Sequence, residues 1–362
     1  MTIKHLRALA LVIASTVSVV DAQQPTGLNG DYVIRNFRFA SGEVMPALDI
    51  HYRTFGKPMR DAAGVVRNAV LVMHGTTGAG TQFLSAQFAG ELYGAGQPLD
   101  TTRFYVILPD GIGHGQSSKP SDSLHARFPH YDYDDMVDAD YKLLTEKLGV
   151  AHLRLVMGTS MGGMHSWVFA ERYPDFMDGV VPLASAPVQI AGRNRIIRRM
   201  VMDNITKDPA WMNGEYRSPP AGLRAALQGL WLMTSAPLVQ QKAAPTRDAA
   251  DSLIERYLDG QMRTMDANNM LYAYDASRNY NPEPMLEKIK APLLAINSAD
   301  DFVNPPELGI LERLMPRVAK GKFLLIPISD RTRGHGTHTV AAVWKDPFAA
   351  FLATLPGLPP LH

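Results

Sequence analysis

Short hydrophobic runs alternate with longer amphipathic stretches along most of the chain. The short runs end at Gly, Pro, Asn or Asp, a pattern that predicts strands separated by turns. Their regular alternation with helical stretches is typical of an α/β fold with a mostly parallel sheet. Eight strands are predicted, at residues 32–39, 47–54, 69–74, 104–109, 153–159, 179–184, 292–298 and 322–328. Ser41-Gly42 joins the first two, which we expect to form an antiparallel hairpin.

Amphipathic periodicity predicts core helices at residues 134–148, 161–173, 306–318 and 340–355. Between residues 187 and 285 the strand rhythm stops, and helical stretches are separated by Pro219-Pro220 and Ala244-Pro245. We therefore expect a core domain of residues 23–186 and 286–362 with a helical cap of residues 187–285. The insertion holds eight of the 18 methionines, whose flexible side chains would give a pocket adaptable walls. These eight are Met200, Met202, Met212, Met233, Met262, Met265, Met270 and Met285.

The N-terminal segment differs from the rest of the chain. Lys4 and Arg7 precede an uncharged stretch at residues 8–20, and Asp21-Ala22 follows it. This pattern predicts a signal peptide, residues 1–22, cleaved after Ala22. The stretch is shorter than the roughly 20 apolar residues that span a bilayer, although an uncleaved anchor or a buried first helix remains the alternative. We expect a periplasmic or secreted protein that has no stable membrane association after cleavage.

The amino-acid composition limits the kinds of molecule that we expect the protein to bind. The chain has 362 residues, 46% of them hydrophobic, which is enough to bury a large core. Its formal net charge is +1, and no run of Lys and Arg alternates with aromatic residues, so nothing points to nucleic acid. No cluster of His and carboxylate residues has the spacing of metal ligands, and the chain has no Cys. We expect a small-molecule acyl substrate and neither a metal nor another cofactor.

A serine occupies the centre of Gly158-Thr159-Ser160-Met161-Gly162, between a predicted strand and a predicted helix. This context is typical of a nucleophile elbow, in which a sharp turn exposes the serine hydroxyl. The glycines suit it because larger side chains would crowd the strand and helix beside the turn. The alternative is an ordinary glycine-rich turn with a capping serine.

A serine nucleophile needs a general base and an acid that orients the base. In α/β proteins whose nucleophile lies on such an elbow, the three residues occur along the chain in the order serine, acid, histidine. Three histidines follow the strand at 292–298, namely His335, His338 and His362. His335 lies between two glycines in the loop before the last helix, so we favour it as the base. His338, at the start of the helix, is the alternative, and the terminal His362 is the least suited.

Two adjacent carboxylates, Asp300 and Asp301, follow that strand. Neighbouring residues at a strand end point in opposite directions, so we expect only one to face the histidine. We favour Asp301, and we expect Asp300 to cap the following helix or face solvent.

The oxyanion of a tetrahedral intermediate requires backbone N–H donors. The amide of Met161 is one candidate, because it opens the helix after the serine. The second is the amide of Thr76, in the turn of residues 74–78 that follows the third strand. His74 precedes the nucleophile and belongs to this turn, so we assign it a structural role.

These motifs resemble the α/β-hydrolase fold, and more narrowly its homoserine O-acetyltransferase-like branch. The resemblance covers nearly the whole chain after the signal segment, through Ser160-Met161-Gly162-Gly163-Met164 and, in the insertion, Asp208-Pro209-Ala210-Trp211. It implies that the catalytic Gly-His of the family falls on Gly334-His335. The family's acid motif places a proline four or five residues after the aspartate, and Pro305-Pro306 then supports Asp301. The resemblance also implies that a homodimer could form through the cap.

Two departures from the acetyltransferases change the expected activity. Their substrate-binding arginine falls on Met202, which cannot bind a carboxylate. Their loop after the fourth strand is replaced by residues 109–117, which resemble ordinary esterases. We expect an exported serine hydrolase that cleaves an ester, a thioester, a lactone or an amide. An O-acyltransferase is the second hypothesis, and a catalytically inactive binding protein is the third.

Overall fold

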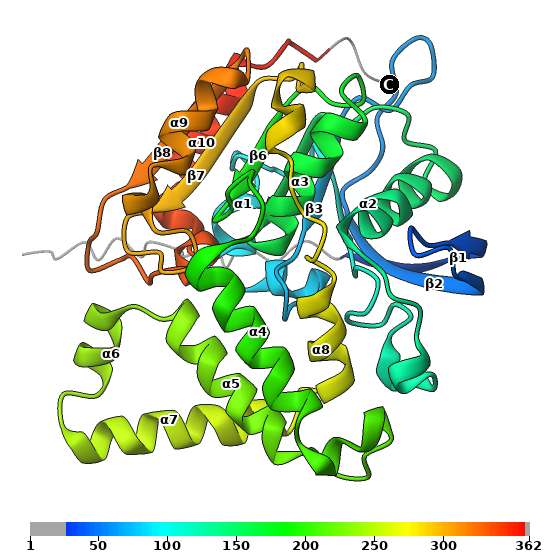
Figure 1. Ribbon diagram of the computed structural model, residues 1–362. Helices are drawn as coiled ribbons and strands as arrows, with labels where there is room; N and C mark the ends of the chain where they lie inside the picture. Colours follow the sequence, from blue (N-terminus) through cyan, green and yellow to red (C-terminus); the bar gives the residue numbers. More distant parts are fainter. Residues whose placement is uncertain (1–26, 359–362) are drawn as a thin grey trace, which may run out of the picture.

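A single eight-stranded sheet runs through the computed structural model, which describes residues 27–358 (Figure 1). The strand order is β1-β2-β4-β3-β5-β6-β7-β8, and β1 and β2 form the predicted hairpin. β2 also pairs with β4 in an antiparallel manner, and the remaining pairs are parallel. The strands are β1 (Leu28–Arg38), β2 (Val44–Phe55), β3 (Ala69–Met73), β4 (Tyr105–Pro109), β5 (Leu155–Thr159), β6 (Val180–Leu183), β7 (Leu293–Ser298) and β8 (Gly321–Ile326).

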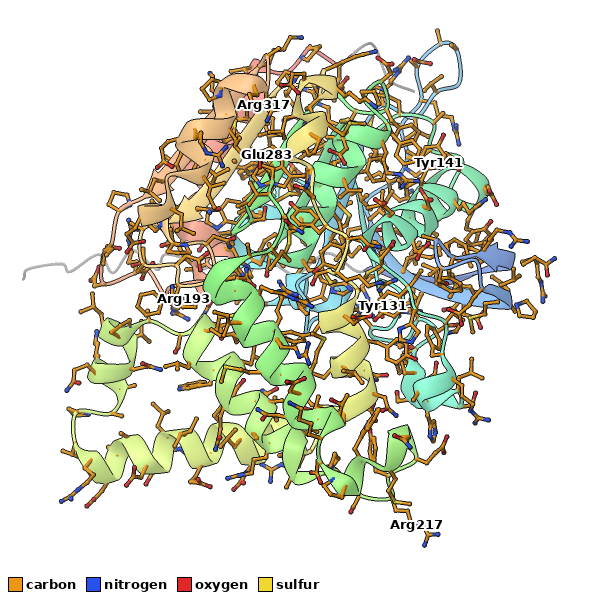
Figure 2. All side chains as sticks on the ribbon, viewed as in Figure 1. Tyr131, Tyr141, Arg193, Arg217, Glu283 and Arg317 are labelled. Atoms are coloured by element: carbon orange, nitrogen blue, oxygen red, sulfur yellow. The ribbon has the colours of Figure 1, made fainter. Side chains whose placement is uncertain are left out.

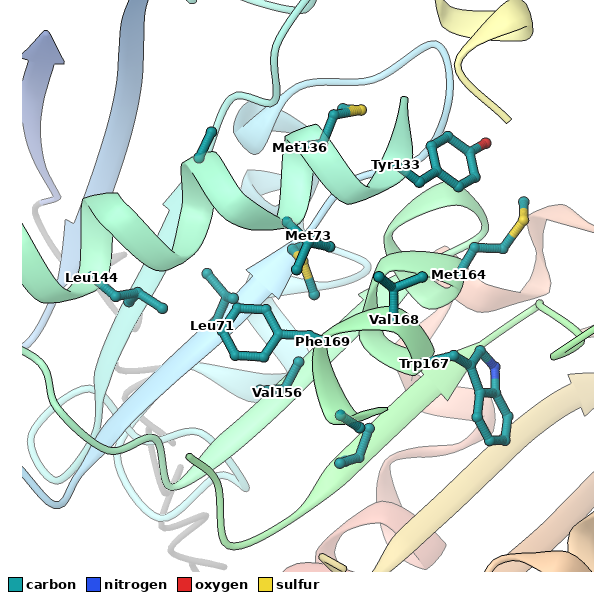
Figure 3. Close-up of a cluster of buried hydrophobic side chains, with 14 of the residues drawn as sticks. Leu71, Met73, Tyr133, Met136, Leu144, Val156, Met164, Trp167, Val168 and Phe169 are labelled. Atoms are coloured by element: carbon teal, nitrogen blue, oxygen red, sulfur yellow. The ribbon is translucent and has the colours of Figure 1, made fainter. Parts of the chain in front are cut away.

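Helices cover both faces of the sheet. Helices α2 (Tyr133–Lys142), α3 (Met161–Arg172) and α9 (Ile310–Leu314) pack on one face, and α1 (Ala89–Leu92) and α10 (Lys345–Thr354) pack on the other. The central strands β3 and β5 are buried at every position because each face of the sheet is covered, and they are mostly apolar. In β3, for example, Leu71 and Met73 contact the first layer (Figure 3), and Val70 and Val72 belong to the hydrophobic cluster of the second layer.

Five helices lie between β6 and β7, and they form a layer beyond the carboxyl ends of the strands (Figure 1). They are α4 (Gly192–Thr206), α5 (Ala221–Thr234), α6 (Pro237–Ala243), α7 (Arg247–Met262) and α8 (Ala267–Asp275), and we call them the cap. The cap has a hydrophobic core of its own, which includes Val201, Leu227 and Leu258. At its junction with the sheet domain, Arg193 donates a 2.6 Å hydrogen bond to the Phe302 carbonyl oxygen (Figure 2).

Two predicted helices are interrupted. The helix expected over residues 306–318 is wrong as a single element, because Gly309 adopts a φ of 58° between a 3₁₀ turn and α9, and Pro316 follows within a second 3₁₀ turn. The helix expected over 134–148 is α2 followed by a π-helical turn at Leu143–Lys147. Within residues 27–358 no helix is long and apolar enough to cross a membrane. The predicted signal peptide and His362 lie outside the described residues.

Candidate active site

Ser160 lies at the apex of a tight turn between β5 and α3. Its backbone has a φ of 55° and a ψ of −111°, a conformation that is strained for a residue other than glycine. The neighbouring glycines are required by close backbone contacts. A Cβ on Gly162 would lie 1.9 Å from the Met73 carbonyl oxygen, and one on Gly158 would lie 2.2 Å from the Gly162 carbonyl oxygen. The local sequence therefore folds as a nucleophile elbow, with the hydroxyl projecting from the carboxyl edge of the sheet.

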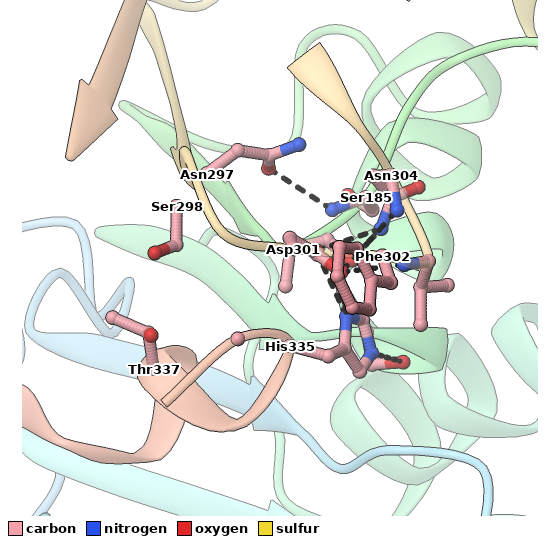
Figure 4. Close-up of polar contacts among 12 residues, drawn as sticks. Ser185, Asn297, Ser298, Asp301, Phe302, Asn304, His335 and Thr337 are labelled. Atoms are coloured by element: carbon pink, nitrogen blue, oxygen red, sulfur yellow. Dashed lines mark hydrogen bonds and ion pairs between the residues drawn. The ribbon is translucent and has the colours of Figure 1, made fainter. Parts of the chain in front are cut away.

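His335 connects this serine to a carboxylate. Its Nε2 lies 2.8 Å from Ser160 Oγ, and its Nδ1 lies 2.9 and 3.0 Å from the two carboxylate oxygens of Asp301 (Figure 4). His335 and Asp301 are buried, whereas Ser160 lines an open cavity. The structure thus brings together the three side chains that the sequence singled out, although they come from the ends of three different strands.

Asp301 is held in its ionised form by its surroundings. Burial alone would raise the pKa of this carboxyl, but the His335 charge and hydrogen bond, together with the Val303 N–H, outweigh burial and lower the pKa below its ordinary value. The Val303 N–H donates to Asp301 Oδ1 over 2.7 Å. An ionised Asp301 accepts a hydrogen bond from the protonated Nδ1 of His335, which leaves Nε2 free to accept a proton from the serine.

The position of Asp300 differs from both expectations. It neither caps the following helix nor faces solvent; it is buried. Its carboxylate accepts a hydrogen bond from the Ser298 hydroxyl and a 2.9 Å hydrogen bond from the Gly334 N–H. Because Gly334 directly precedes His335, Asp300 anchors the loop that carries the imidazole. The two adjacent carboxylates therefore hold the same loop at two points, one through the backbone and one through the ring.

The surroundings and the lowered pKa values of two other histidines exclude them as the general base. His338 lies beside His335, with ring centroids 5.2 Å apart, but its Nδ1 has no hydrogen-bond partner among the described residues. Burial and the neighbouring His335 lower its pKa to about 3. His74 donates from Nδ1 to the Gly75 carbonyl oxygen and accepts from the Gly111 N–H at Nε2. Burial followed by the charge of His114 lowers the pKa of His74 to about 3, which fits the structural role expected for it.

The turn after β3 lies directly against the elbow. A Cβ on Gly75 would be 3.6 Å from the Ser160 Cβ, and Thr76 lines the same cavity as Ser160. Within residues 27–358 the N–H groups of Thr76 and Met161 donate to no protein acceptor. His114 Nε2 lies 2.8 Å from the Thr76 carbonyl oxygen and fixes this part of the turn. The two N–H groups therefore remain available to an acceptor other than the protein, as an oxyanion hole requires.

Gln82 joins the turn to the elbow, a role that the sequence did not suggest. Its Oε1 accepts a 3.2 Å hydrogen bond from the Gly75 N–H, and its Nε2 donates over 2.9 Å to Thr159 Oγ1. Since Thr159 directly precedes the serine, one side chain sets the spacing between the two backbone segments. A glutamine in a short 3₁₀ helix has no local pattern that would single it out.

A cavity of about 890 Å³ opens over Ser160 and extends beneath the cap. Its walls are formed by the turn after β3, the His335 loop and the cap helices α4, α5, α7 and α8. Of the eight cap methionines, only Met233, Met265 and Met270 are among the described residues that line it. Met202 does not line the cavity, whereas Arg198, one turn earlier on α4, does. Within residues 27–358 no group of three or more His, Asp or Glu could hold a metal ion.

Comparison with known proteins identifies the family. Residues 68–317 match the family model for the alpha/beta hydrolase fold. The chain belongs to the alpha/beta-hydrolase family. A homoserine O-acetyltransferase from Pelobacter propionicus is 32% identical, with 88% of this chain and 92% of that protein covered. A probable acyltransferase from Methanothermobacter thermautotrophicus is 30% identical, with 79% and 87% covered. The crystal structure of esterase E22 superposes with a TM-score of 0.79 at 20% identity, covering 90% of this chain and all of that one.

This alpha/beta-hydrolase is thus placed in the homoserine O-acetyltransferase-like branch, as its motifs indicated. It is an enzyme of a superfamily whose members near it include both esterases and acyltransferases. The similarity to the esterase, at 20% identity, shows only that the two proteins share a fold. Whether water or another molecule accepts the acyl group must therefore be inferred from the site itself.

Proposed function

We propose that this alpha/beta-hydrolase is a serine hydrolase that cleaves a carboxylic ester-type bond through an acyl-enzyme. The observation that carries the proposal is the hydrogen-bonded series Ser160 Oγ, His335 Nε2, His335 Nδ1 and Asp301. A serine hydroxyl is a weak nucleophile at neutral pH, and a histidine in this position can take its proton as attack begins.

The reaction proceeds in two halves. Ser160 Oγ attacks the carbonyl carbon while its proton passes to His335 Nε2, and the N–H groups of Thr76 and Met161 stabilise the oxyanion. His335 then gives that proton to the leaving alkoxide, the carbon–oxygen bond breaks and the acyl group stays on Ser160. Water attacks the acyl-enzyme with His335 again as base, and the carboxylic acid leaves. Each half returns the imidazole to its neutral state.

Acyl transfer to an alcohol or amine is the second candidate, and the identity to acetyltransferases favours it. Met202, at the place of the acetyltransferase arginine, argues against homoserine as the acceptor. The test is to incubate the purified protein with acetyl-CoA and homoserine and, separately, with 4-nitrophenyl acetate in water. The proposal expects rapid release of 4-nitrophenol and little O-acetylhomoserine by mass spectrometry. Acetyl transfer more efficient than ester hydrolysis would contradict it.

Export is the remaining part of the proposal. It is supported by the basic residues, uncharged stretch and Ala22 cleavage position at the N-terminus. Cell fractionation followed by N-terminal sequencing tests it directly. The proposal expects a periplasmic or secreted protein that begins at Gln23, and a cytoplasmic protein retaining Met1 would contradict it.

A further inference from the structure

A buried arginine without an acidic partner lies in the wall of the catalytic cavity. Arg198 is on α4, and its side chain is only 2% exposed, yet it lines the same cavity as Ser160. Burying a charge costs several kcal/mol unless it is paired, so a buried arginine is normally matched by a carboxylate. Among the described residues, Arg198 forms no ion pair with Asp or Glu.

The protein contacts of Arg198 are all neutral. Its Nε donates to Asn194 Oδ1 over 2.9 Å, and its Nη1 donates to Ser277 Oγ over 3.1 Å. The guanidinium carbon lies 5.4 Å from the centroid of the Tyr274 ring, a cation–π contact that covers one face. An arginine has five N–H groups, so three of them remain, one on Nη1 and two on Nη2.

The other charged side chains near Arg198 or in the cavity wall already have partners within the protein. Arg199, the next residue on α4, is exposed and forms an ion pair with Asp203. Lys119, which also lines the cavity, is paired with Asp122 at 2.7 Å. Asp266 lines the cavity too, but it caps α8 and accepts two hydrogen bonds within the cap. None of these carboxylates is available to neutralise the buried guanidinium.

Arg198 lines the same cavity as Thr76, whose N–H is assigned to the oxyanion hole. The Tyr133 hydroxyl is buried and makes no hydrogen bond to the described residues. Burial raises the pKa of this hydroxyl, and the charge of Arg198 partly offsets the rise, with smaller effects from the side chains of Ser277 and Thr76. The groups that act on the Tyr133 hydroxyl thus include Arg198 on α4 and Thr76 in the turn after β3.

We propose that Arg198 binds a carboxylate of the substrate, so that the preferred ester carries a carboxylate on its acyl or its alcohol part. This inference rests on the proposed function, because it names the substrate class of the same site. The flat carboxylate matches the free edge of the guanidinium, where N–H groups of Nη1 and Nη2 can donate to its two oxygens. A bound substrate carboxylate would supply the negative charge that no described Asp or Glu provides to Arg198.

Two pairs of esters that differ only in charge test this assignment. The first pair is 4-nitrophenyl hydrogen glutarate and its methyl ester, with the carboxylate on the acyl part. The second is acetoxyacetate and methyl acetoxyacetate, with the carboxylate on the alcohol part. For each pair the measurement is the ratio of kcat/KM for the anionic ester to that for the neutral ester. We expect the ratio to exceed one in the pair that places its carboxylate at Arg198.

Arg198→Met should lower that ratio by about 10- to 100-fold, the loss expected for a charge-assisted hydrogen bond. Arg198→Lys should lose less, because the charge remains. Arg199→Met is the matched control, since it removes an exposed charge from the same helix, and it should leave the ratio unchanged. A purely structural arginine would not change a ratio between two substrates. Ratios that stay at the wild-type value in both pairs for Arg198→Met and Arg198→Lys would overturn the inference.

A binding measurement separates this inference from the proposed chemistry. Calorimetry with Ser160→Ala should detect binding of at least one of the two anionic esters, and Ser160→Ala/Arg198→Met should lack this binding while Ser160→Ala/Arg199→Met keeps it. If the wild type hydrolysed none of the four esters, the proposed function would fail while the calorimetry still decided the role of Arg198. Equal binding with and without Arg198 would overturn the inference alone. Circular dichroism of each variant establishes that it is folded, and Arg198→Lys provides the comparison if Arg198→Met is not.

Discussion

His335 Nε2 lies 2.8 Å from Ser160 Oγ, although 175 positions separate the two residues. The contact exists because the parallel strands β5 and β8 deliver their following loops to the same edge of the sheet. It therefore depends on the strand order β5-β6-β7-β8 and on the anchoring of both loops.

Asp301 should contribute more to catalysis than the adjacent Asp300. Asp301→Asn removes the charge that orients and stabilises the protonated imidazole, and kcat for ester hydrolysis should fall by about 10⁴-fold. Asp300→Asn keeps an oxygen that can accept the Gly334 N–H, so its loss should be no more than about tenfold. Steady-state kinetics on one ester compare the variants. Equal losses would show that the two carboxylates share one role.

Gln82 should affect catalysis through the spacing of the oxyanion turn. Gln82→Ala removes both hydrogen bonds, the one accepted from the Gly75 N–H and the one donated to Thr159 Oγ1, and kcat should fall by about tenfold while KM changes little. Thr159→Val breaks one of these contacts from the other side. If the residues act together, the double variant should lose no more than Gln82→Ala alone. A kcat within twofold of the wild type in Gln82→Ala would show that the turn is held by other contacts.

Asp140 should make the stability of the fold depend on pH. It is buried in α2, and burial raises the pKa of its carboxyl to about 8, against about 4 for an unfolded chain. Between these values the folded state holds a proton that the unfolded state has lost, so the free energy of unfolding falls as pH rises from about 4 to about 8. Asp140→Asn removes this dependence.

Urea denaturation at pH 5 and pH 9 measures the effect. The free energy of unfolding of Asp140→Asn should exceed that of the wild type by a few kcal/mol more at pH 9 than at pH 5. The pH 5 measurement is the control, since the proton is then mostly retained in the folded wild type. A difference between the proteins that is the same at both pH values would mean that Asp140 is not protonated in the fold.

Periodicity and motif context were sufficient to predict the eight strands and the three residues of the Ser160 series. Most of the strands are short apolar runs between turn residues, and the fold fixes the order in which serine, acid and histidine follow. The broken helix at 306–318 was missed because an amphipathic pattern continues through Gly309, whose positive φ separates the 3₁₀ turn from α9.

Other features required coordinates because they join segments far apart in sequence. Gln82 contacts Thr159 across 77 positions, and the hydrogen bond from Gly334 to Asp300 spans 34. Arg198 entered no sequence argument, since an arginine on an amphipathic helix is normally exposed. Only the packing of α4 against α8 shows that it is buried beside the cavity.

The central claim is that Ser160 is the nucleophile activated by His335. The most direct measurement is the intact mass of the protein after incubation with a fluorophosphonate, followed by peptide mapping, for the wild type, Ser160→Ala and His335→Ala. The wild type should gain one adduct on Ser160, Ser160→Ala should gain none, and His335→Ala should react at least about 10³-fold more slowly. Labelling that persists in Ser160→Ala, or a wild type that does not react, would contradict the assignment.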